Sequence, residues 1–153
     1  MIDVLLREAK YKDAELILKW RNNPLVWQGS YTQNKENRPI TWYEHWKWWS
    51  GRVFWQTFII QVDKRDVGYV NIGKLNSTKP EIGIAVGETE LWGKGIGKQA
   101  LKLAIEWIKG KGYKTVYAGV LKDNERSLKL FNSIGFKVVG DVREGELALE
   151  LTL

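Results

Sequence analysis

Two stretches in the first third of the chain have apolar residues at the spacing of helical turns. Asp13 is suited to cap the first helix and Pro24 to end it, because proline lacks the N–H that a helix interior needs. The apolar face of this helix would carry Leu16, Ile17 and Trp20. The second stretch, 41-TWYEHWKWWSG-51, opens with Thr41 and Glu44 in the pattern of a capping box. Four of its side chains share helical spacing: Trp42, His45, Trp46 and Trp49.

After Gly51 the pattern becomes that of strands. Residues 54–62 and 67–75 are rich in β-branched and aromatic residues and are joined by a turn at 63–66, which predicts a hairpin. The remaining elements are a strand at 81–86, a helix at about 98–109 ended by Gly110 and Gly112, a strand at 114–121, a helix at 124–134 closed by Gly135, and a last hairpin of 136–142 and 146–153. The order β-α-α-β-β-β-α-β-α-β-β predicts a mixed α/β fold with helices on the faces of one sheet.

Composition narrows the possible chemistry. The 153 residues are most simply one domain, 1–153, large enough to bury a core. The absence of cysteine excludes disulfides and thiolate chemistry, and a single histidine argues against a zinc site or a serine–histidine triad, so no metal is expected. No apolar run of transmembrane length and no signal peptide occurs, which favours a cytoplasmic protein with no membrane partner. The net charge of +6 favours anionic partners, although a solvated basic surface explains it equally well.

The segment 91-LWGKGIGKQA-100 places three glycines where the long helix should begin. A glycine there costs about 1 kcal/mol relative to alanine. Backbone N–H groups that converge on an anion at the positive end of the helix would offset that cost, and Lys94 and Lys98 add charge. A P-loop does not fit, because Gly95 stands where a serine or threonine should bind magnesium. A dinucleotide-binding fingerprint matches in its glycines, but no acidic residue follows at the distance that ribose binding requires.

A third kind of anion-binding loop fits better. Residues 91–136 resemble the acyl-CoA-binding core of the GNAT N-acetyltransferase superfamily. The pyrophosphate loop of that family, Q/R-x-x-G-x-G/A, corresponds to 92-WGKGIG-97, and its second signature, N-x-x-S/A-x-x-L-Y/F-x-x-x-G-F, corresponds to 124-NERSLKLFNSIGF-136. The resemblance implies a single domain with a mixed, mostly antiparallel seven-stranded sheet flanked by about four helices. It also implies acetyl-CoA as cosubstrate, no metal, and direct acetyl transfer to a primary amine.

The resemblance assigns contacts with CoA to particular residues. These are Trp92, Gly93, Lys94, Gly95, Ile96, Gly97 and Lys98 in the loop, and Asn124, Ser127 and Phe131 on the following helix. Backbone N–H groups near Ala85 and Val86 would hold the thioester carbonyl. Asn124 would serve equally as a helix cap, and Ser127 as a cover for its helix.

Two residues depart from the family pattern. Trp92 occupies the Q/R position, as it often does in the branch that acetylates ribosomal-protein N-termini and sugar amines. Phe131 stands where many members carry a tyrosine that protonates the departing CoA thiolate. Either another group protonates the thiolate, or it leaves unassisted, which its modest basicity allows.

The attacking amine must be neutral, and two side chains are candidates for the base that deprotonates it. Glu81 opens the strand before the loop, where relatives place a carboxylate that acts through water; the alternative is an exposed strand-edge residue. His45 has the ordinary pKa nearest neutrality, although it also suits simple packing among tryptophans. We favour Glu81 as the base, with His45 orienting the acceptor.

In relatives the segment between the first two helices builds the acceptor site, here residues 20–39 together with the tryptophan-rich helix. The pairing of 20-WRNNPLV-26 with 44-EHWKWW-49 resembles acetyltransferases of nucleotide-linked amino sugars, and the ribosomal-protein branch slightly less. The candidate acceptor contacts are Arg21, Asn22 and Trp46. Arg21 would also suit a helix C-terminal end, and rings at helical spacing a core.

Other readings of the function remain open at this point. An N-terminal acetyltransferase of a ribosomal or other protein and a non-catalytic acyl-CoA sensor are the alternatives to a small-molecule enzyme. Nucleic-acid binding is disfavoured, because the chain has neither an RNP-like aromatic motif nor a basic recognition helix. The protein is expected to be a monomer or a homodimer.

Overall fold

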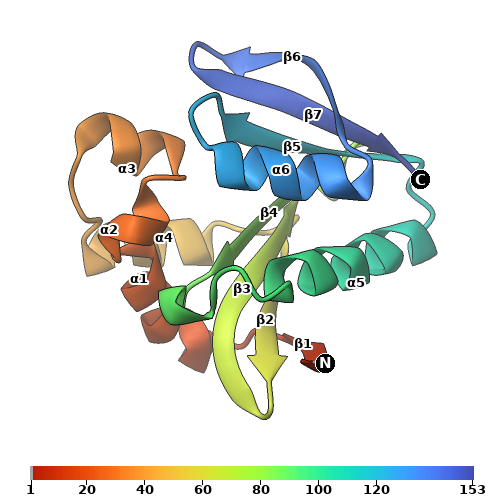
Figure 1. The fold of residues 1–153 in the computed structure, drawn as a ribbon. Coiled ribbons are helices and arrows are strands. Elements are labelled where there is room, and N and C mark those ends of the chain that lie inside the picture. Colours follow the sequence, from red (N-terminus) through yellow and green to blue (C-terminus); the bar gives the residue numbers. More distant parts are fainter. Residues whose placement is uncertain (1) are drawn as a thin grey trace.

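The computed structural model describes residues 2–153, and Figure 1 shows how their elements are arranged. The strands are β1 Val4–Glu8, β2 Gln56–Val62, β3 Arg65–Gly73, β4 Glu81–Val86, β5 Thr115–Leu121, β6 Lys137–Arg143 and β7 Glu146–Thr152. The helices are α1 Ala14–Arg21, α2 Pro24–Trp27, α3 Tyr31–Glu36, α4 Trp42–Ser50, α5 Ile96–Gly110 and α6 Glu125–Ile134, with 3₁₀ turns at Tyr11–Asp13 and Thr89–Leu91. The element order predicted from the sequence is confirmed, except that α2 and α3 are additional.

The two additional helices lie in a segment whose polar composition concealed them. Each is too short to show an apolar periodicity, so capping groups define it instead. The side chain of Asn23 accepts a hydrogen bond from the N–H of Leu25 at 3.0 Å, and Pro24 takes the first helical position, where its missing N–H does no harm. Asn37 ends α3 in the left-handed conformation, with φ of 51°.

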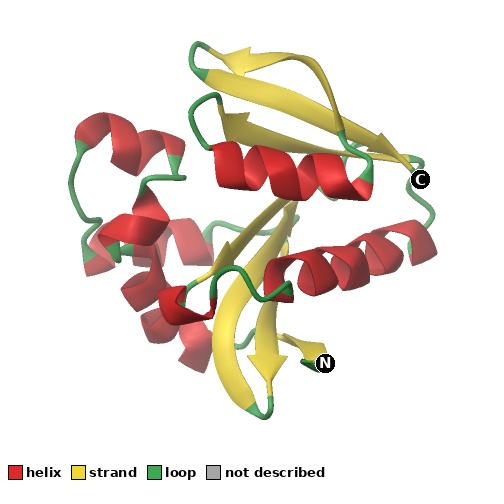
Figure 2. Ribbon diagram, viewed as in Figure 1, coloured by secondary structure: helices red, strands yellow, loops and turns green. Residues whose placement is uncertain are grey.

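The strands of residues 2–153 form one seven-stranded sheet in the order β1-β2-β3-β4-β5-β7-β6. Every neighbouring pair is antiparallel except β4 and β5, which are parallel. The predicted mixed, mostly antiparallel sheet is therefore confirmed, with helices on both faces as Figure 2 shows. Among these residues no helix combines the length and the apolar character needed to cross a bilayer.

Strands β4 and β5 diverge almost as soon as they meet. Within the described chain their pairing is limited to Glu81 opposite Tyr117, where the Tyr117 N–H donates to the carbonyl of Pro80 at 3.0 Å. Beyond that point β4 continues to Val86 and β5 to Leu121 without further pairing. The divergence leaves backbone groups on one edge of β4 unpaired, and this opening positions the candidate site.

The two faces of the sheet carry separate clusters of buried side chains. On one face α5 and α6 bury a large apolar core, which includes Leu101 of α5 and Phe131 of α6. On the other face Ile17 and Trp20 of α1 pack on β2 and β3, partly covered by tryptophans of α4. Each fully buried aliphatic side chain contributes about 1.5–3 kcal/mol to folding. The helices are therefore fixed on the sheet from both sides, with the opening of β4 between them.

The inward face of α4 differs from the predicted one. His45 is fully buried and Trp48 and Trp49 are half-buried, whereas Trp42 and Trp46 are 45% and 43% exposed. Residues three or four positions apart lie on the same side of a helix, so His45 can share a buried face with Trp48 and Trp49 as readily as with Trp42. In α4 the positions three and four residues after His45 are the ones that pack inward, so that Trp48, and not Trp46, faces the sheet.

Candidate active site

The glycine segment forms a turn whose backbone N–H groups face an open space. Gly93 and Gly95 both have φ of +81°, a conformation that side chains with a Cβ rarely adopt, and no atom lies within 4 Å of where either Cβ would stand. Gly95 is the N-cap residue of α5, and no side chain caps it. The first N–H groups of α5 are therefore left for a ligand, at the positive end of a 15-residue helix. Lys98 lines the same hollow, which has a volume of about 210 Å³.

The free edge of β4 forms one wall of this hollow. The Gly87 N–H donates to the Val67 carbonyl of the β3 side at 2.8 Å, so residues of β4 with odd numbers direct their backbone groups toward β3. Residues with even numbers therefore face β5, as the Pro80 carbonyl does. Because β5 has turned away, the N–H groups of Ile84 and Val86 open into the cleft. The N–H of Ala85 points to β3, which makes Val86 the better donor of the predicted pair.

Trp92 and Arg126 line the same hollow as the free edge of β4. The Trp92 Nε1–H donates to the Val86 carbonyl at 2.8 Å, and the Arg126 guanidinium lies 3.2 Å from the Trp92 ring centroid. Arg126 lies in the first turn of α6, where a positive charge is unfavourable to the helix dipole. Sequence reasoning missed this residue, and its charge at that position was the available signal.

Asn124 and Ser127 reach the cleft, as predicted. The side-chain oxygen of Asn124 accepts from the Ser127 N–H at 3.2 Å, so Asn124 does cap α6. Its amide nitrogen would lie 3.0 Å from a Cβ at Gly29, which places it across from the turn between α2 and α3. Both side chains line a chamber of about 260 Å³ beside β4.

Phe131 does not line any of the three cavities near the glycine segment. It is 4% exposed and packs edge-to-face on Phe136, with ring centroids 5.0 Å apart, while the neighbouring Leu130 faces the cleft. The predicted contact between Phe131 and CoA is therefore corrected to a core position one residue away. The tyrosine that does line the chamber is Tyr69 of β3, whose pKa is raised by burial.

Glu81 lies at the closed end of the divergence, on the same face of β4 as Gly83 and Ala85, since side chains alternate along a strand. Ala85 packs toward α1, which identifies this as the face that α1 and α4 cover. Nothing occupies the space within 4 Å of a Cβ at Gly83, so the surface between Glu81 and the chamber is open. Gly83 lines the chamber and Glu81 stands two residues away, about 7 Å along the strand.

His45 does not reach the cleft. It is fully buried, and both ring nitrogens are engaged: Nε2 lies 2.8 Å from the carbonyl of Ala14, and Nδ1 lies 3.0 Å from Nη1 of Arg21. A carbonyl can only accept, so Nε2 carries the proton and Nδ1 accepts from Arg21. Burial and the charge of Arg21 lower the pKa of His45 to about 4, which keeps the ring neutral at pH 7. A direct contact between His45 and a substrate is therefore corrected to a contact with Arg21.

The three candidate acceptor contacts have different surroundings. Arg21 lines the chamber, together with Trp48. Asn22 is occupied, since its side chain donates to the Ile40 carbonyl at 2.9 Å and accepts from the Ile40 N–H at 2.8 Å. Trp46 points to solvent and lines none of the three cavities. Asn22 therefore fastens the end of α1 to the chain before α4, and Trp48 takes the place predicted for Trp46.

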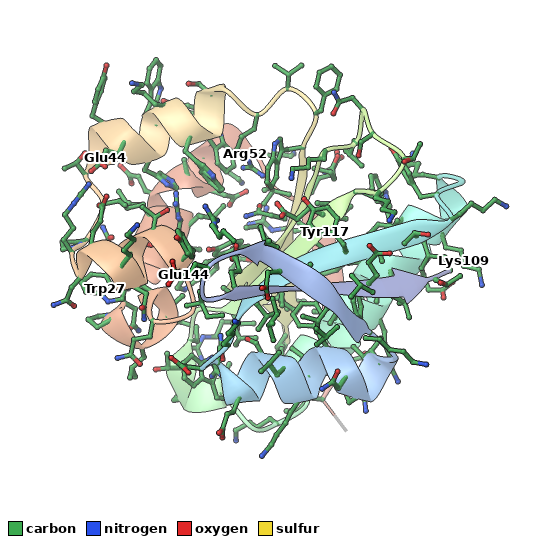
Figure 3. All side chains as sticks on the ribbon, turned by 90° about the horizontal axis from the view of Figure 1, so that it is seen from above. Trp27, Glu44, Arg52, Lys109, Tyr117 and Glu144 are labelled. Carbon is green, nitrogen blue, oxygen red and sulfur yellow. The ribbon has the colours of Figure 1, made fainter. Side chains whose placement is uncertain are left out.

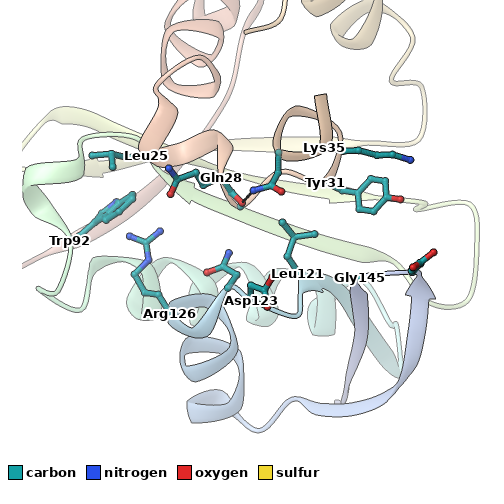
Figure 4. Close-up of a pocket in the computed structure, with 13 residues that line it drawn as sticks. Leu25, Gln28, Tyr31, Lys35, Trp92, Leu121, Asp123, Arg126 and Gly145 are labelled. Atoms are coloured by element: carbon teal, nitrogen blue, oxygen red, sulfur yellow. Dashed lines mark hydrogen bonds between the residues drawn. The ribbon is translucent and has the colours of Figure 1, made fainter. Parts of the chain in front are cut away.

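A larger cavity of about 760 Å³ continues from the chamber, between the α2–α3 segment and the loop that joins β5 to α6. Figure 4 shows Trp92 and Arg126 at one end of it and Tyr31 and Lys35 at the other. Residues 2–153 contain no group of three or more His, Asp or Glu side chains arranged to hold a metal ion.

Comparison with known proteins places this geometry in a family. Residues 3–137 match the profile described as acetyltransferase (GNAT) domain. The uncharacterized protein MJ1062 of Methanocaldococcus jannaschii is 41% identical over 154 residues, which are 98% of this chain and 31% of that protein. The N-alpha-acetyltransferase RimI of Mycobacterium tuberculosis is 34% identical over 77 residues, 48% of this chain and 47% of that protein. The chain thus spans less than half the length of these two curated relatives.

Solved structures agree with this assignment. The crystal structure of a domain from Methanocaldococcus jannaschii DSM 2661 has a TM-score of 0.94 and 40% sequence identity, with all of both chains covered. The aminoglycoside acetyltransferase AAC(6')-Ib in complex with coenzyme A has a TM-score of 0.84 over 98% of this chain and 95% of that one, and at 15% identity it shares the fold alone. The resemblance inferred from residues 92–97 and 124–136 is confirmed. The chain belongs to the GNAT acetyltransferase family.

Proposed function

We propose that this domain transfers the acetyl group of acetyl-CoA to a primary amine of a small molecule, and that this molecule is a nucleotide-linked amino sugar. One observation carries the proposal: the unpaired N–H groups of Ile84 and Val86 face the same hollow as the glycine turn that opens α5. A thioester carbonyl and a pyrophosphate are the two parts of acetyl-CoA that need such donors. The domain would act in the cytoplasm, as a monomer or a homodimer.

The pyrophosphate of acetyl-CoA would bind at the start of α5. There the N–H groups after Gly95 and the ammonium groups of Lys94 and Lys98 supply donors and positive charge. The pantetheine arm would follow the free edge of β4, with Asn124 and Ser127 opposite it. The thioester oxygen would then accept from the Val86 N–H, which is fixed before the reaction and stabilises the charge that develops on that oxygen.

The reaction needs one proton removed and one returned. The amine nitrogen attacks the thioester carbon, the carbon–sulfur bond breaks, and the amine proton passes through water to Glu81. Glu81 suits this step because it lies on the face of β4 that borders the chamber, with open space above Gly83 between. The CoA thiolate leaves without a tyrosine acid at position 131 and takes its proton from solvent, since a thiol of ordinary pKa near 8.5 is a fair leaving group.

The acceptor would enter through the larger cavity. Aromatic side chains there, Tyr31 and Trp92, offer faces on which a sugar or a nucleobase can stack, and Lys35 and Arg126 offer positive charge. Similar structures include a spermidine N-acetyltransferase of Vibrio cholerae in complex with CoA and spermine, at 16% identity. We favour a nucleotide-linked amino sugar over a protein N-terminus because α3 and the β6–β7 turn line opposite walls of the cavity with aromatic and charged side chains, which suits a ring-bearing, charged ligand.

Two measurements test this proposal. Calorimetry with acetyl-CoA should give saturable binding, and a thiol-release assay across a panel of amines should give amine-dependent release of CoA with a UDP-linked amino sugar among the better acceptors. Binding without release for any amine would indicate an acyl-CoA sensor instead. Release that occurs only with peptides bearing free N-termini would indicate a protein N-terminal acetyltransferase.

A further inference from the structure

Two arginine side chains lie against one tryptophan ring at the wall of the chamber beside β4. Arg21 ends α1 and Arg52 follows α4, and the guanidinium carbon of each lies 4.2 Å from the centroid of the Trp48 ring. Arg21 and Trp48 line the chamber together with Asn71 of β3. Figure 3 shows Arg52 where the chain leaves α4 and returns to the sheet. Two positive charges are thus held close together beside the proposed site of transfer.

Neither guanidinium has a carboxylate partner. No ion pair among residues 2–153 includes Arg21 or Arg52. Arg21 donates to the neutral ring of His45, and Arg52 donates to side-chain oxygens of Thr57 and Asn71. The Nε atom of Arg52 is buried and has no acceptor in the described chain. The side chains that accept hydrogen bonds from each cation are therefore neutral.

Such an arrangement is costly unless an anion joins it. Burial lowers the pKa of Arg21, and burial together with the charge of Arg21 lowers the pKa of Arg52 to about 10. Taking an ion out of water costs several kcal/mol if no opposite charge compensates. Arg7, on β1, provides the contrast within the same molecule: its guanidinium binds Asp13 at 2.8 Å and Asp66 at 2.9 Å. Within residues 2–153, carboxylates thus form ion pairs with Arg7, whereas none does so with Arg21 or Arg52.

We propose that Arg21, supported by the positive charge of Arg52 behind it, binds an anionic group of the acceptor, a phosphate or a carboxylate, while its amine lies against the free edge of β4. This rests on the proposed transfer reaction and narrows its acceptors to amines that also carry a negative charge. Arg21 makes the direct contact, because His45 occupies only one of its five N–H donors and the planar fork matches both kinds of anion. Arg52 adds charge from behind Asn71. Polycationic amines are excluded by the same two charges.

The sheet register fixes how far the anion lies from the amine. Asn71 is opposite Gly83 across the β3–β4 pair, and Tyr69 is opposite Ala85. Asn71, beside the arginines, and Gly83, near the proposed thioester, thus lie on neighbouring strands, which are about 5 Å apart. Arg21, Asn71 and Val86 line one chamber of about 260 Å³. The anion and the reacting amine are therefore a few bonds apart, and the rest of the acceptor extends into the larger cavity.

The first part of the test measures anion binding without catalysis. Thermal unfolding is followed with inorganic phosphate, pyrophosphate or acetate added in the presence of saturating CoA, which occupies the glycine turn. The wild-type protein should gain a few degrees in Tm from at least one of these anions. Arg21→Gln and Arg52→Gln should lose most of this gain. Arg65→Gln removes the same charge from an exposed arginine paired with Glu88 and Glu90, and should keep it.

The second part uses matched acceptors to tell the anions apart. Glucosamine 6-phosphate is compared with glucosamine for the phosphate, and glycine with glycinamide for the carboxylate. The charged member of at least one pair should be preferred by tenfold or more in kcat/KM, about the worth of one charge-assisted hydrogen bond. Arg21→Gln should remove that preference, and Arg21→Lys should restore part of it by returning the charge without the fork.

Equal use of charged and neutral acceptors, or a preference that survives both glutamine variants, would overturn the anion site while leaving the transfer reaction intact. Anion protection that depends on Arg21 in a protein that acetylates no amine would leave the anion site standing and refute the transfer reaction. If Arg21→Gln unfolds, Arg52→Gln alone tests the anion site. Arg52 lies behind the chamber wall and makes no hydrogen bond to His45, so its replacement leaves the bonds of His45 intact.

Discussion

The indole N–H of Trp92 donates to the carbonyl of Val86 at 2.8 Å, so the first residue of the glycine loop is tied to the last residue of β4. This bond uses the carbonyl of Val86 and leaves its N–H open to the cleft. It also fixes the indole ring against which the Arg126 guanidinium lies at 3.2 Å. One side chain thus couples the proposed pyrophosphate site to the proposed thioester site.

Trp92→Phe should keep an aromatic ring at this position and remove the hydrogen bond to Val86. We expect the Kd for acetyl-CoA to rise about fivefold, the equivalent of roughly 1 kcal/mol for one hydrogen bond. Calorimetry checks this. Trp107→Phe is the matched control. Trp107, on α5, packs on Phe58 of β2 and lies outside the cleft, so its replacement should leave the affinity for acetyl-CoA unchanged.

Gly95→Val should abolish acetyl-CoA binding and leave the fold intact. Valine is strained at φ of +81°, and its branched side chain would stand among the N–H groups that open α5. Gly112→Val is the control, because Gly112 has φ of +95° at the other end of the same helix. Both variants should lower Tm by similar amounts, and only the first should lose the calorimetric signal. Unchanged affinity in Gly95→Val would place the pyrophosphate elsewhere.

Most residues that line the hollow at the start of α5 could be predicted because they are local in the sequence. The turn at Gly93 and Gly95 depends on glycines that stand next to the helix they open, and Asn124 and Ser127 are one helical turn apart. Phe131 was misplaced because spacing alone does not tell whether a helical residue faces a cleft or the core beside it. Its edge-to-face packing on Phe136 decides that, and such packing is a tertiary property.

The acceptor side could be predicted only in part. Arg21 was named from the sequence and does line the chamber, but Arg52 lies in a turn without any periodic pattern, two residues after α4 ends, and its position against Trp48 could not be predicted. The choice between Trp46 and Trp48 depends on how α4 rotates onto the sheet, which is set by the burial of His45. Contacts between α1, α4 and its following turn, and β3 determine this region, and those contacts join residues about 20–50 positions apart.

Phe131→Tyr should change turnover by less than tenfold, or about 1.4 kcal/mol of activation free energy. The new hydroxyl would enter a core in which Phe131 is 4% exposed, so we also expect a loss of roughly 1–2 kcal/mol in the free energy of unfolding. Steady-state kinetics and urea unfolding measure the two effects. A large gain in turnover would show that protonation of the thiolate limits the natural protein.

His45 should make the protein less stable in mild acid. The unfolded state takes up a proton at the ordinary pKa of 6.5, whereas the folded state does so only near pH 4, because burial opposes the charge. Between these values the unfolded state binds more protons, so stability is complete above about pH 6.5 and falls as pH is lowered to 4. This difference between the folded and unfolded pKa corresponds to at most about 3–4 kcal/mol of stability.

Urea unfolding at several pH values compares the unvaried protein with His45→Gln. His45 is the only histidine, so the difference between the two curves isolates its titration from that of the carboxylates. The variant should be less stable at pH 7.5 and should lose less stability between pH 6.5 and 4.5. Since His45 holds Arg21, the variant should also raise the acceptor KM more than it lowers kcat. Parallel curves would mean that His45 titrates normally in the folded protein.

The assignment of the base depends on Glu81 and on the carboxylate opposite it. Glu81 of β4 and Glu150 of β7 are the residues paired with Tyr117 of β5, one on each side. Glu150 is engaged by Lys79 at 3.0 Å, whereas Glu81 lies near the side chains of Tyr117 and Lys74 and beside the open space at Gly83 that leads to the chamber. The two glutamates thus share a face of the sheet but differ in access to the proposed acceptor amine.

Glu81→Gln should therefore lower kcat by about 10² or more with little change in the acetyl-CoA KM, because it removes a proton acceptor and keeps the shape of the side chain. Raising the pH should partly restore kcat, since a larger fraction of the amine is then already neutral. Glu150→Gln should leave kcat within about threefold, as expected of a residue away from the reacting atoms. If kcat survives in Glu81→Gln and is lost in His45→Gln, the base is not Glu81, and the neutral histidine behind Arg21 must contribute to the proton transfer.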